Sequence, residues 1–130
     1  MKSISQSAPQ DARVILRAFE EPDEVRMMEE GRYEVVRIGG QVFGRATYEP
    51  GWRWSEHVGP SVGARCGVEH LGLVLAGRAT AAFDDGMITE LRQGQLFYIP
   101  PVAHDSSVVG DEPCEPFHFL GADRYAKVTG

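Results

Sequence analysis

Short runs in which apolar and polar residues alternate recur along the chain, and glycine, proline or aspartate separates one run from the next. Such alternation is typical of β-strands. Gly39-Gly40 and Asp84-Asp85-Gly86 each lie between two runs and predict β-hairpin turns. The runs cover residues 32–38, 41–49, 51–57, 66–77, 78–83, 87–91, 95–100, 105–110 and 114–121. About nine short strands without an internal repeat predict an all-β fold, either an antiparallel sandwich or a small barrel.

The 130 residues are long enough for one domain with a modest core. We place the barrel in residues 32–121 and treat residues 1–31 as an N-terminal extension that packs on the barrel or on a partner subunit. Within this extension, residues 13–19 are compatible with a strand or a single helical turn. The acidic residues 20–24 contain Pro22 and predict a turn. The polar residues 1–12 predict a weakly docked end.

Composition excludes several classes of partner. The net charge is −6 and the basic residues are scattered, which argues against a nucleic-acid-binding or anionic-membrane-binding surface. No apolar run approaches the ~18 residues that span a bilayer, and the N-terminal residues lack the apolar segment of a signal peptide. We therefore expect a cytoplasmic protein in which Cys66 and Cys114 are free thiols.

Residues 49–57, EPGWRWSEH, place two tryptophans two positions apart in a polar run. Read as a strand, this stretch points Trp52 and Trp54 to one face and Arg53, Ser55 and His57 to the other. Alternation alone does not say which of the two faces looks into the protein.

Two spaced motifs resemble those of the cupin superfamily. In the first, Gly51 is followed after five residues by His57, and His70 is followed after six residues by Gly77, with His70 where the family usually has glutamate. In the second, five residues separate Gly94 from Pro100, and His104 follows. The sequence departs from the family at the second histidine of the first motif, which falls at Gly59, and in the second motif, where Val102 replaces glycine and the terminal asparagine is missing.

The resemblance implies an antiparallel double-stranded β-helix, or jelly-roll barrel, with little helix. It also implies that His57, His70 and His104 hold one divalent transition metal ion, with Zn, Fe, Mn, Ni and Cu as the candidates. Three imidazole ligands leave coordination positions open for water or substrate. Cys66 lies four residues before His70 and is either a fourth ligand or a small buried packing residue. With His57 facing inward, Trp52 and Trp54 become outward-facing packing residues.

We expect a metal-dependent enzyme, dioxygenase-like or isomerase-like, that acts on a small molecule. Because His70 replaces an acidic ligand, the ion keeps its full charge, which favours an anionic ligand or a hydroxide. Tyr98, Glu69 and Asp105 are candidate proton carriers. The alternative is a non-catalytic ligand-binding or sensor module, favoured by the lack of a dedicated acid–base pair. The candidates for substrate contact are Arg53, Ser55, Tyr98 and His118.

The run from residue 66 to residue 77 is apolar on both faces. Leu71, Leu73 and Leu75 share one face, and His70 lies on the other. If the histidine face lines the barrel, the leucines need a separate cover, which the opposing sheet, the N-terminal segment or a second subunit would supply. We expect a homodimer.

Overall fold

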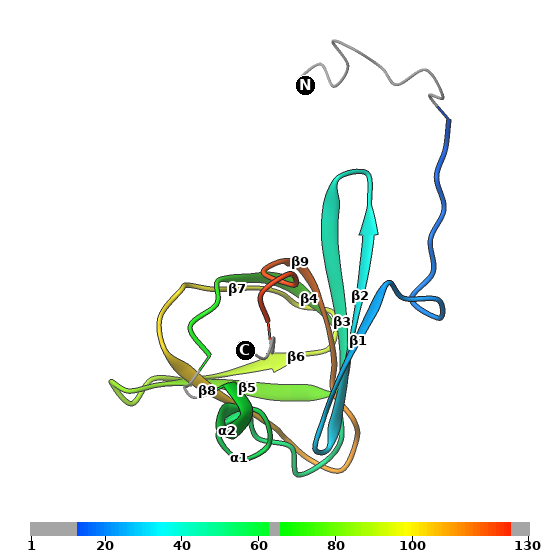
Figure 1. Ribbon diagram of the computed structural model, residues 1–130. Helices are drawn as coiled ribbons and strands as arrows, with labels where there is room; N and C mark the ends of the chain where they lie inside the picture. The colour runs from blue at the N-terminus through cyan, green and yellow to red at the C-terminus, as the bar shows by residue number, and fades with distance from the viewer. Residues whose placement is uncertain (1–12, 63–65, 126–130) are drawn as a thin grey trace.

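Two antiparallel β-sheets face each other and close into a barrel in the computed structural model (Figure 1), which describes residues 13–62 and 66–125. Within these residues, one sheet has six strands in the order β1-β2-β3-β9-β4-β7, and the other has three in the order β6-β5-β8. The strands are β1 (Glu24–Met28), β2 (Gly31–Ile38), β3 (Gln41–Tyr48), β4 (His70–Ala76), β5 (Arg78–Phe83), β6 (Ile88–Arg92), β7 (Leu96–Ile99), β8 (His104–Val108) and β9 (Glu115–Leu120).

The predicted hairpins form where turn residues separate alternating runs. β2 and β3 pair in register from Gly31 opposite Tyr48 to Ile38 opposite Gln41. Gly39 and Gly40 join them with φ of 59° and 79°, a left-handed backbone conformation that glycine adopts without strain. The tip of this hairpin extends beyond the barrel (Figure 1). The prediction of an all-β antiparallel barrel is confirmed.

Alternation along the strands selects the side chains that fill the barrel. In β2, Tyr33 and Val35 face inward, and in β3 Ala46 and Tyr48 do so. A second group of buried residues comes from the strands on the other side of the barrel, and it comprises Val74, Ala79, Ala81, Phe97, Ile99 and Cys114. The core is therefore the barrel interior, into which any polar inward-facing residue must also project.

The prediction of a strand over residues 51–57 is wrong. Trp52 N donates to Glu49 O, closing a turn, and the chain then forms two single-turn helices, α1 (Trp54–His57) and α2 (Gly59–Val62). In a helix, residues four apart share a side, so Trp54 and Val58 are both buried. The assignment of Trp52 and Trp54 to one face and of Arg53, Ser55 and His57 to the other assumed a strand, so it does not hold here.

Two other segments also differ from the sequence-based expectation. β1 was not predicted, and it pairs with β2 from Glu24 opposite Val35 to Met28 opposite Gly31. Residues 13–19 form neither a strand nor a helix. The expectation for residues 1–12 lies outside the described residues. None of the helices in the described part of the chain has the length and hydrophobicity needed to span a bilayer.

Candidate metal centre

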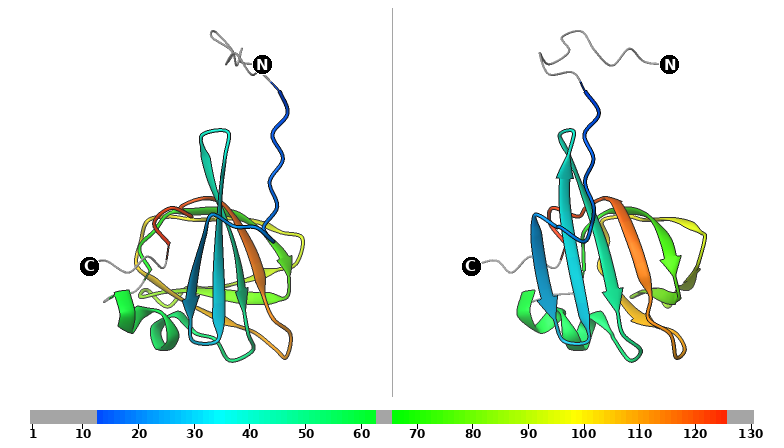
Figure 2. Two further views of the ribbon diagram at one scale, coloured as in Figure 1. Left: turned by 45° about the vertical axis from the view of Figure 1, so that its right-hand side comes forward. Right: turned by 90° about the vertical axis from the view of Figure 1, so that its right-hand side faces the viewer.

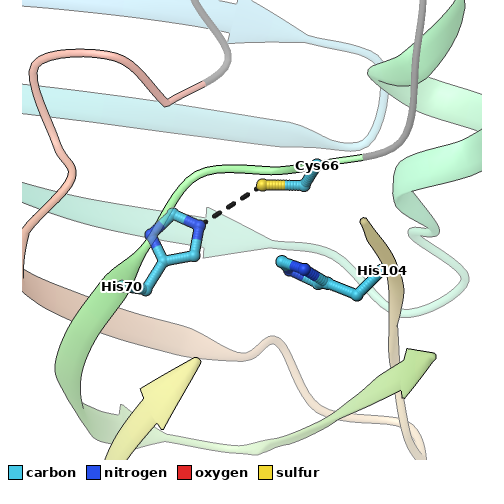
Figure 3. Close-up of side chains that lie close together, drawn as sticks. All are labelled: Cys66, His70 and His104. Carbon is cyan, nitrogen blue, oxygen red and sulfur yellow. Dashed lines mark hydrogen bonds between the residues drawn. The ribbon is translucent and has the colours of Figure 1, made fainter. Parts of the chain in front are cut away.

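Three buried side chains meet inside the barrel: Cys66, His70 and His104 (Figure 3). One potential ligand atom from each lies within 4.8 Å of the other two. Cys66 Sγ and His70 Nε2 are 3.3 Å apart, within hydrogen-bond distance for sulfur. Cys66 and His70 are four residues apart, and the barrel brings the distant His104 beside them.

Backbone pairing fixes the positions of these three residues. His70 begins β4 and pairs with Ile99 of β7, so its side chain points into the barrel. His104 begins β8, and its N–H donates to Cys66 O at 3.0 Å in an isolated antiparallel bridge. The segment that enters β4 is thereby tied to the start of β8.

The ring of His104 is held in one tautomer. Its Nδ1 lies 2.9 Å from Val102 O. A carbonyl oxygen only accepts hydrogen bonds, so Nδ1 donates the proton, and in the neutral ring Nε2 keeps a free lone pair. A backbone carbonyl on the far nitrogen is the partner that metal-ligating histidines commonly have.

The ring of His70 has an unsatisfied nitrogen. Its Nε2 faces Cys66, but its buried Nδ1 has no hydrogen-bond partner among the described residues. Gly121 packs beside this nitrogen, where a β-carbon would lie 3.1 Å from Nδ1. Buried polar atoms without partners are rare in folded proteins, but this nitrogen points away from Cys66 and lies outside the group of potential ligand atoms.

Burial keeps the cluster uncharged at neutral pH. It lowers the pKa of His70 to about 3, with the nearby His104 adding to the effect, and it lowers the pKa of His104. Burial also raises the pKa of the Cys66 thiol to about 11. The two imidazoles are therefore in the neutral form that binds metals, whereas the thiol loses its proton only when a cation stabilises the thiolate.

His118 lies beside this cluster and is oriented by a tyrosine. Its ring stacks on that of His70 with centroids 4.5 Å apart, and its Nδ1 lies 2.6 Å from the hydroxyl of Tyr33. Tyr33 comes from β2 and His118 from β9, on either side of β3. Gly44 of β3 makes this contact possible, because a β-carbon there would overlap the Tyr33 hydroxyl. His118 is buried inside the barrel, and its candidate role as a substrate contact stays a prediction.

The cavity at the cluster is small. Its volume is about 40 Å³, enough for a few water-sized molecules and well below the roughly 150 Å³ of an engineered cavity that holds benzene. Tyr125 covers it, with its ring 5.1 Å from that of His70 and 5.3 Å from that of His118. The cavity is lined by the three potential ligands and by Tyr48, Trp54, Val74, Ala79, Leu91, Phe97, Ile99, Ser106, Cys114, Pro116, His118 and Tyr125.

A buried arginine holds the C-terminal turn that carries Tyr125. The guanidinium of Arg26 donates to the carbonyl oxygens of Ala122 at 2.9 Å, Asp123 at 3.2 Å and Tyr125 at 2.5 Å. Glu24 accepts from the same guanidinium at 2.7 Å. The hydroxyl of Tyr125 also bonds to that of Tyr48. The turn is thus fastened to β1 and closes the barrel over the cluster.

His57, Arg53 and Ser55 do not reach the cluster. His57 ends α1, is partly exposed, and accepts a hydrogen bond from Arg53 N through Nδ1 at 3.0 Å. The Ser55 hydroxyl donates to Asp105 at 2.7 Å, and Arg53 pairs with Glu56 at 3.2 Å. These residues form a polar network at the surface. These residues stay outside the cluster because residues 54–57 form a single-turn helix rather than a strand, and this helix directs the side chain of Trp54 inward.

Tyr98 lies on the outer face of the sheet. It is exposed and donates to Glu69 at 2.5 Å. Both tryptophans are buried rather than facing outward: Trp52 stacks on Tyr48 at 3.8 Å, and Trp54 lines the cavity. Tyr33, Tyr48 and Tyr125 are the residues that sequence reasoning missed. Alternation marks Tyr33 and Tyr48 as inward-facing, but nothing in the local pattern reveals their polar partners.

Comparison with known proteins places the fold. No protein-family model and no curated protein matches the sequence. The polyketide cyclase RemF from Streptomyces resistomycificus is similar in structure, with a TM-score of 0.60 and 15% identity over 82% of this chain and 78% of that one. The oxalate decarboxylase of Lactobacillus farciminis has a TM-score of 0.54 and 15% identity over 75% of this chain and 30% of that one.

A protein of unknown function from Acidithiobacillus ferrooxidans also has a TM-score of 0.54, with 17% identity over 75% of this chain and 86% of that one. At these identities the likeness bears on the fold and not on the activity. Together with the order of the strands, it identifies the architecture: the chain has the antiparallel β-barrel fold of the cupins.

Proposed function

We propose that the protein binds one divalent transition metal ion through Cys66, His70 and His104. The observation that carries this proposal is the buried group of three donor atoms within 4.8 Å of one another. The free Nε2 lone pair of His104 supports it, and His70 presents its Nε2 to the same group, 3.3 Å from Cys66 Sγ.

This donor set differs from the three histidines expected from the sequence, since Cys66 takes the place of His57. Two imidazoles and one thiolate favour Zn, Cu or Fe over Mg or Ca, which prefer oxygen ligands. The thiolate also removes one positive charge from the site. The preference for an anionic ligand is therefore weaker than a three-histidine site would give.

We further propose that the bound ion serves a metal-dependent enzyme with a small substrate. Three protein ligands leave a coordination position open, and the cavity beside them has room for water-sized molecules. When bound, such an ion supplies Lewis-acid or redox chemistry. His118, oriented by Tyr33, is the neighbouring side chain that holds or moves a proton. An organic substrate requires the turn that carries Tyr125 to move aside.

A non-catalytic ligand-binding module is the second candidate. The small volume of the cavity favours it, and no aspartate or glutamate is among the described residues that line the cavity. A site without a carboxylate lacks the most common acid–base partner after histidine. In both candidates Cys66 must stay reduced, so we propose a cytoplasmic location.

Cobalt substitution tests the metal site. Titration of the metal-free protein with Co²⁺ should produce a thiolate-to-cobalt charge-transfer band that saturates at one ion per chain. The band should be absent from Cys66→Ser and unchanged in Cys114→Ser, the matched control. A spectrum without this band, or one that both variants share, would refute ligation by Cys66. Substrate turnover by the loaded protein, as opposed to saturable binding alone, then separates the enzyme from the binding module.

A further inference from the structure

Tyr33 and His118 form a buried pair in which a phenol is hydrogen-bonded to a base. The Tyr33 hydroxyl lies 2.6 Å from His118 Nδ1, and this nitrogen is its only hydrogen-bond partner among the described residues. The phenolic O–H therefore donates to Nδ1, because the opposite arrangement would leave a buried O–H proton without an acceptor. An acceptor for the phenolic proton is thus already in place when the ring loses an electron.

Tyr33 also belongs to a series of aromatic side chains in contact, called here the aromatic relay and comprising Trp52, Tyr48, Tyr125 and Tyr33. Trp52 stacks on Tyr48 with ring centroids 3.8 Å apart. The hydroxyls of Tyr48 and Tyr125 share a hydrogen bond, and the rings of Tyr125 and Tyr33 have centroids 4.6 Å apart. Tyr33 and Tyr48 come from β2 and β3, which lie side by side in both views of Figure 2. Each ring of the relay is therefore close enough to the next to exchange an electron with it.

One end of the relay lies just below the surface. Trp52 is buried, but the residues on either side of it, Gly51 and Arg53, are exposed. Its buried Nε1 has no hydrogen-bond partner among the described residues. An oxidised indole is trapped when it releases its Nε1 proton to an acceptor, and Trp52 has none. An electron that Trp52 loses to an oxidant in solution is therefore replaced from Tyr48.

Tyr33, at the other end, is the only member of the relay as described that donates a hydrogen bond to an imidazole nitrogen. The hydroxyls of Tyr48 and Tyr125 bond to each other, and a phenol oxygen is a much weaker base than an imidazole nitrogen. An oxidised phenol is a strong acid, so the tyrosine beside the strongest base is the easiest to oxidise. We therefore expect the loss of an electron anywhere in the relay to end at Tyr33.

We propose that Tyr33 is a redox-active tyrosine, which gives one electron through the aromatic relay to a one-electron oxidant of the class of oxidised transition-metal complexes. In this step the Tyr33 O–H bond breaks, the proton forms an N–H bond at His118 Nδ1, and the oxidant is reduced by one electron. The products are a neutral tyrosyl radical and an imidazolium that remain hydrogen-bonded. Because His118 stacks on His70 with centroids 4.5 Å apart, the pair lies beside the donor group of the metal centre. The step itself needs no metal in that centre.

Photo-oxidation followed by electron paramagnetic resonance tests this proposal on the metal-free, full-length chain. Tris-bipyridyl ruthenium(III), generated by a flash with a cobalt(III) ammine as electron acceptor, should produce a tyrosyl radical in samples frozen after the flash. Tyr33→Phe should lose this signal. Tyr98→Phe, which removes an exposed tyrosine that bonds to Glu69, is the matched control and should keep it. No tyrosyl signal in the unmodified chain, a signal that persists in Tyr33→Phe, or one that disappears in Tyr98→Phe would overturn the proposal.

Two further variants keep Tyr33 and test its partner. His118→Gln retains a hydrogen-bond acceptor but not a base, so the radical yield should fall at least about 10-fold, since hydrogen bonds to charged groups are among the strongest. Gly44→Ala moves the Tyr33 hydroxyl away from His118 and should also lower the yield, whereas Gly40→Ala should not. Circular dichroism checks that each variant is folded. An unchanged yield in His118→Gln would refute the role of the pair.

Discussion

The ring of His104 has its ligating nitrogen free in the folded chain. The Val102 carbonyl holds the proton on Nδ1, leaving the Nε2 lone pair free beside Cys66 and His70. Burial raises the pKa of the Cys66 thiol to about 11, so this thiol is protonated in the metal-free protein and must lose its proton to bind a metal. Metal binding therefore releases a proton from this thiol, and affinity should rise with pH.

His57 provides the sharpest contrast at the level of single residues. His57→Ala should leave metal affinity within about two-fold of the unmodified chain, because His57 lies outside the donor group. His104→Ala should weaken affinity at least 10–100-fold, the loss typical even of residues that only support a ligand. Competition with a chromophoric chelator measures both. Equal losses in the two variants would mean that the single-turn helix α1 does not describe the metal-bound protein.

The buried histidines make the metal-free protein sensitive to mild acid. The pKa of His70 falls from its usual 6.5 to about 3, and burial lowers those of His104 and His118 in the same direction. Below pH 6.5 the unfolded chain binds protons that the folded chain does not, so stability is full above pH 6.5 and is lost as the pH falls.

For His70 alone the loss should reach about 2 kcal/mol at pH 5, and the other two histidines should add to it. Urea denaturation between pH 7.5 and pH 5, with a chelator present, measures this change. The window lies above the range in which the paired carboxylates titrate. A free energy of unfolding that stays constant across it would show that these histidines are hydrated or protonated in the folded state.

Gly44 has a specific role next to the cluster. Gly44→Ala should destabilise the protein by about 1–3 kcal/mol, because the added methyl overlaps the Tyr33 hydroxyl and forces it away from His118. Chemical denaturation measures the loss. Gly40→Ala, which meets no neighbouring atom but has a positive φ, separates backbone strain from overlap. A Gly44→Ala variant that keeps full stability would mean that Tyr33 does not cross β3 at this point.

At the level of elements, the stretch from residue 49 to residue 57 shows the limit of alternation. The spacing of Trp52 and Trp54 fits both a strand and an irregular turn that leads into a helix, because such a short segment does not distinguish the two periods. The turn at Gly51 and the bridge between Arg53 and Ser107 decide the outcome through tertiary contacts. Both tryptophans are packing residues, as expected, but Trp54 also lines the cavity beside Cys66 and His70.

The C-terminal turn places Tyr125 against the cavity, and the hydrogen bonds of Arg26 hold this turn in place. In a Cys114→Ser background, Arg26→Gln should increase the rate at which a thiol reagent modifies Cys66 by roughly 10-fold, since each charge-assisted hydrogen bond contributes about 1.5–3 kcal/mol. The turn would then open more often and expose the cavity. The reaction is followed by absorbance under native conditions.

Arg37→Gln is the matched control for this experiment, since Arg37 also contacts Glu24 but does not touch the turn. It should leave the reaction rate unchanged. If both variants react at the rate of the parent protein, access to Cys66 does not pass through the C-terminal turn. Circular dichroism of each variant excludes general unfolding as the cause of an increase.

For the whole molecule, periodicity and turn residues were sufficient to predict the class of fold. The hairpins at Gly39-Gly40 and at Asp84-Asp85-Gly86 follow from local chemistry. The shared face of Cys66 and His70 also follows from their spacing of four residues on an extended segment, but the choice between ligand and packing residue for Cys66 does not. The positions of Tyr33 and Tyr125 at the site could not be predicted, because their contacts with His118 and His70 join parts of the chain that are distant in sequence.

The metal content of the protein, measured directly, tests the central claim. Protein expressed without added metal, reconstituted with Zn²⁺ and freed of excess ion, should contain about one ion per chain by elemental analysis. The double variant C66S/H104A should contain less than about a tenth of that, while His57→Ala should match the unmodified chain. Equal metal content in all three proteins, or none in the unmodified chain after reconstitution, would contradict a metal centre at Cys66, His70 and His104.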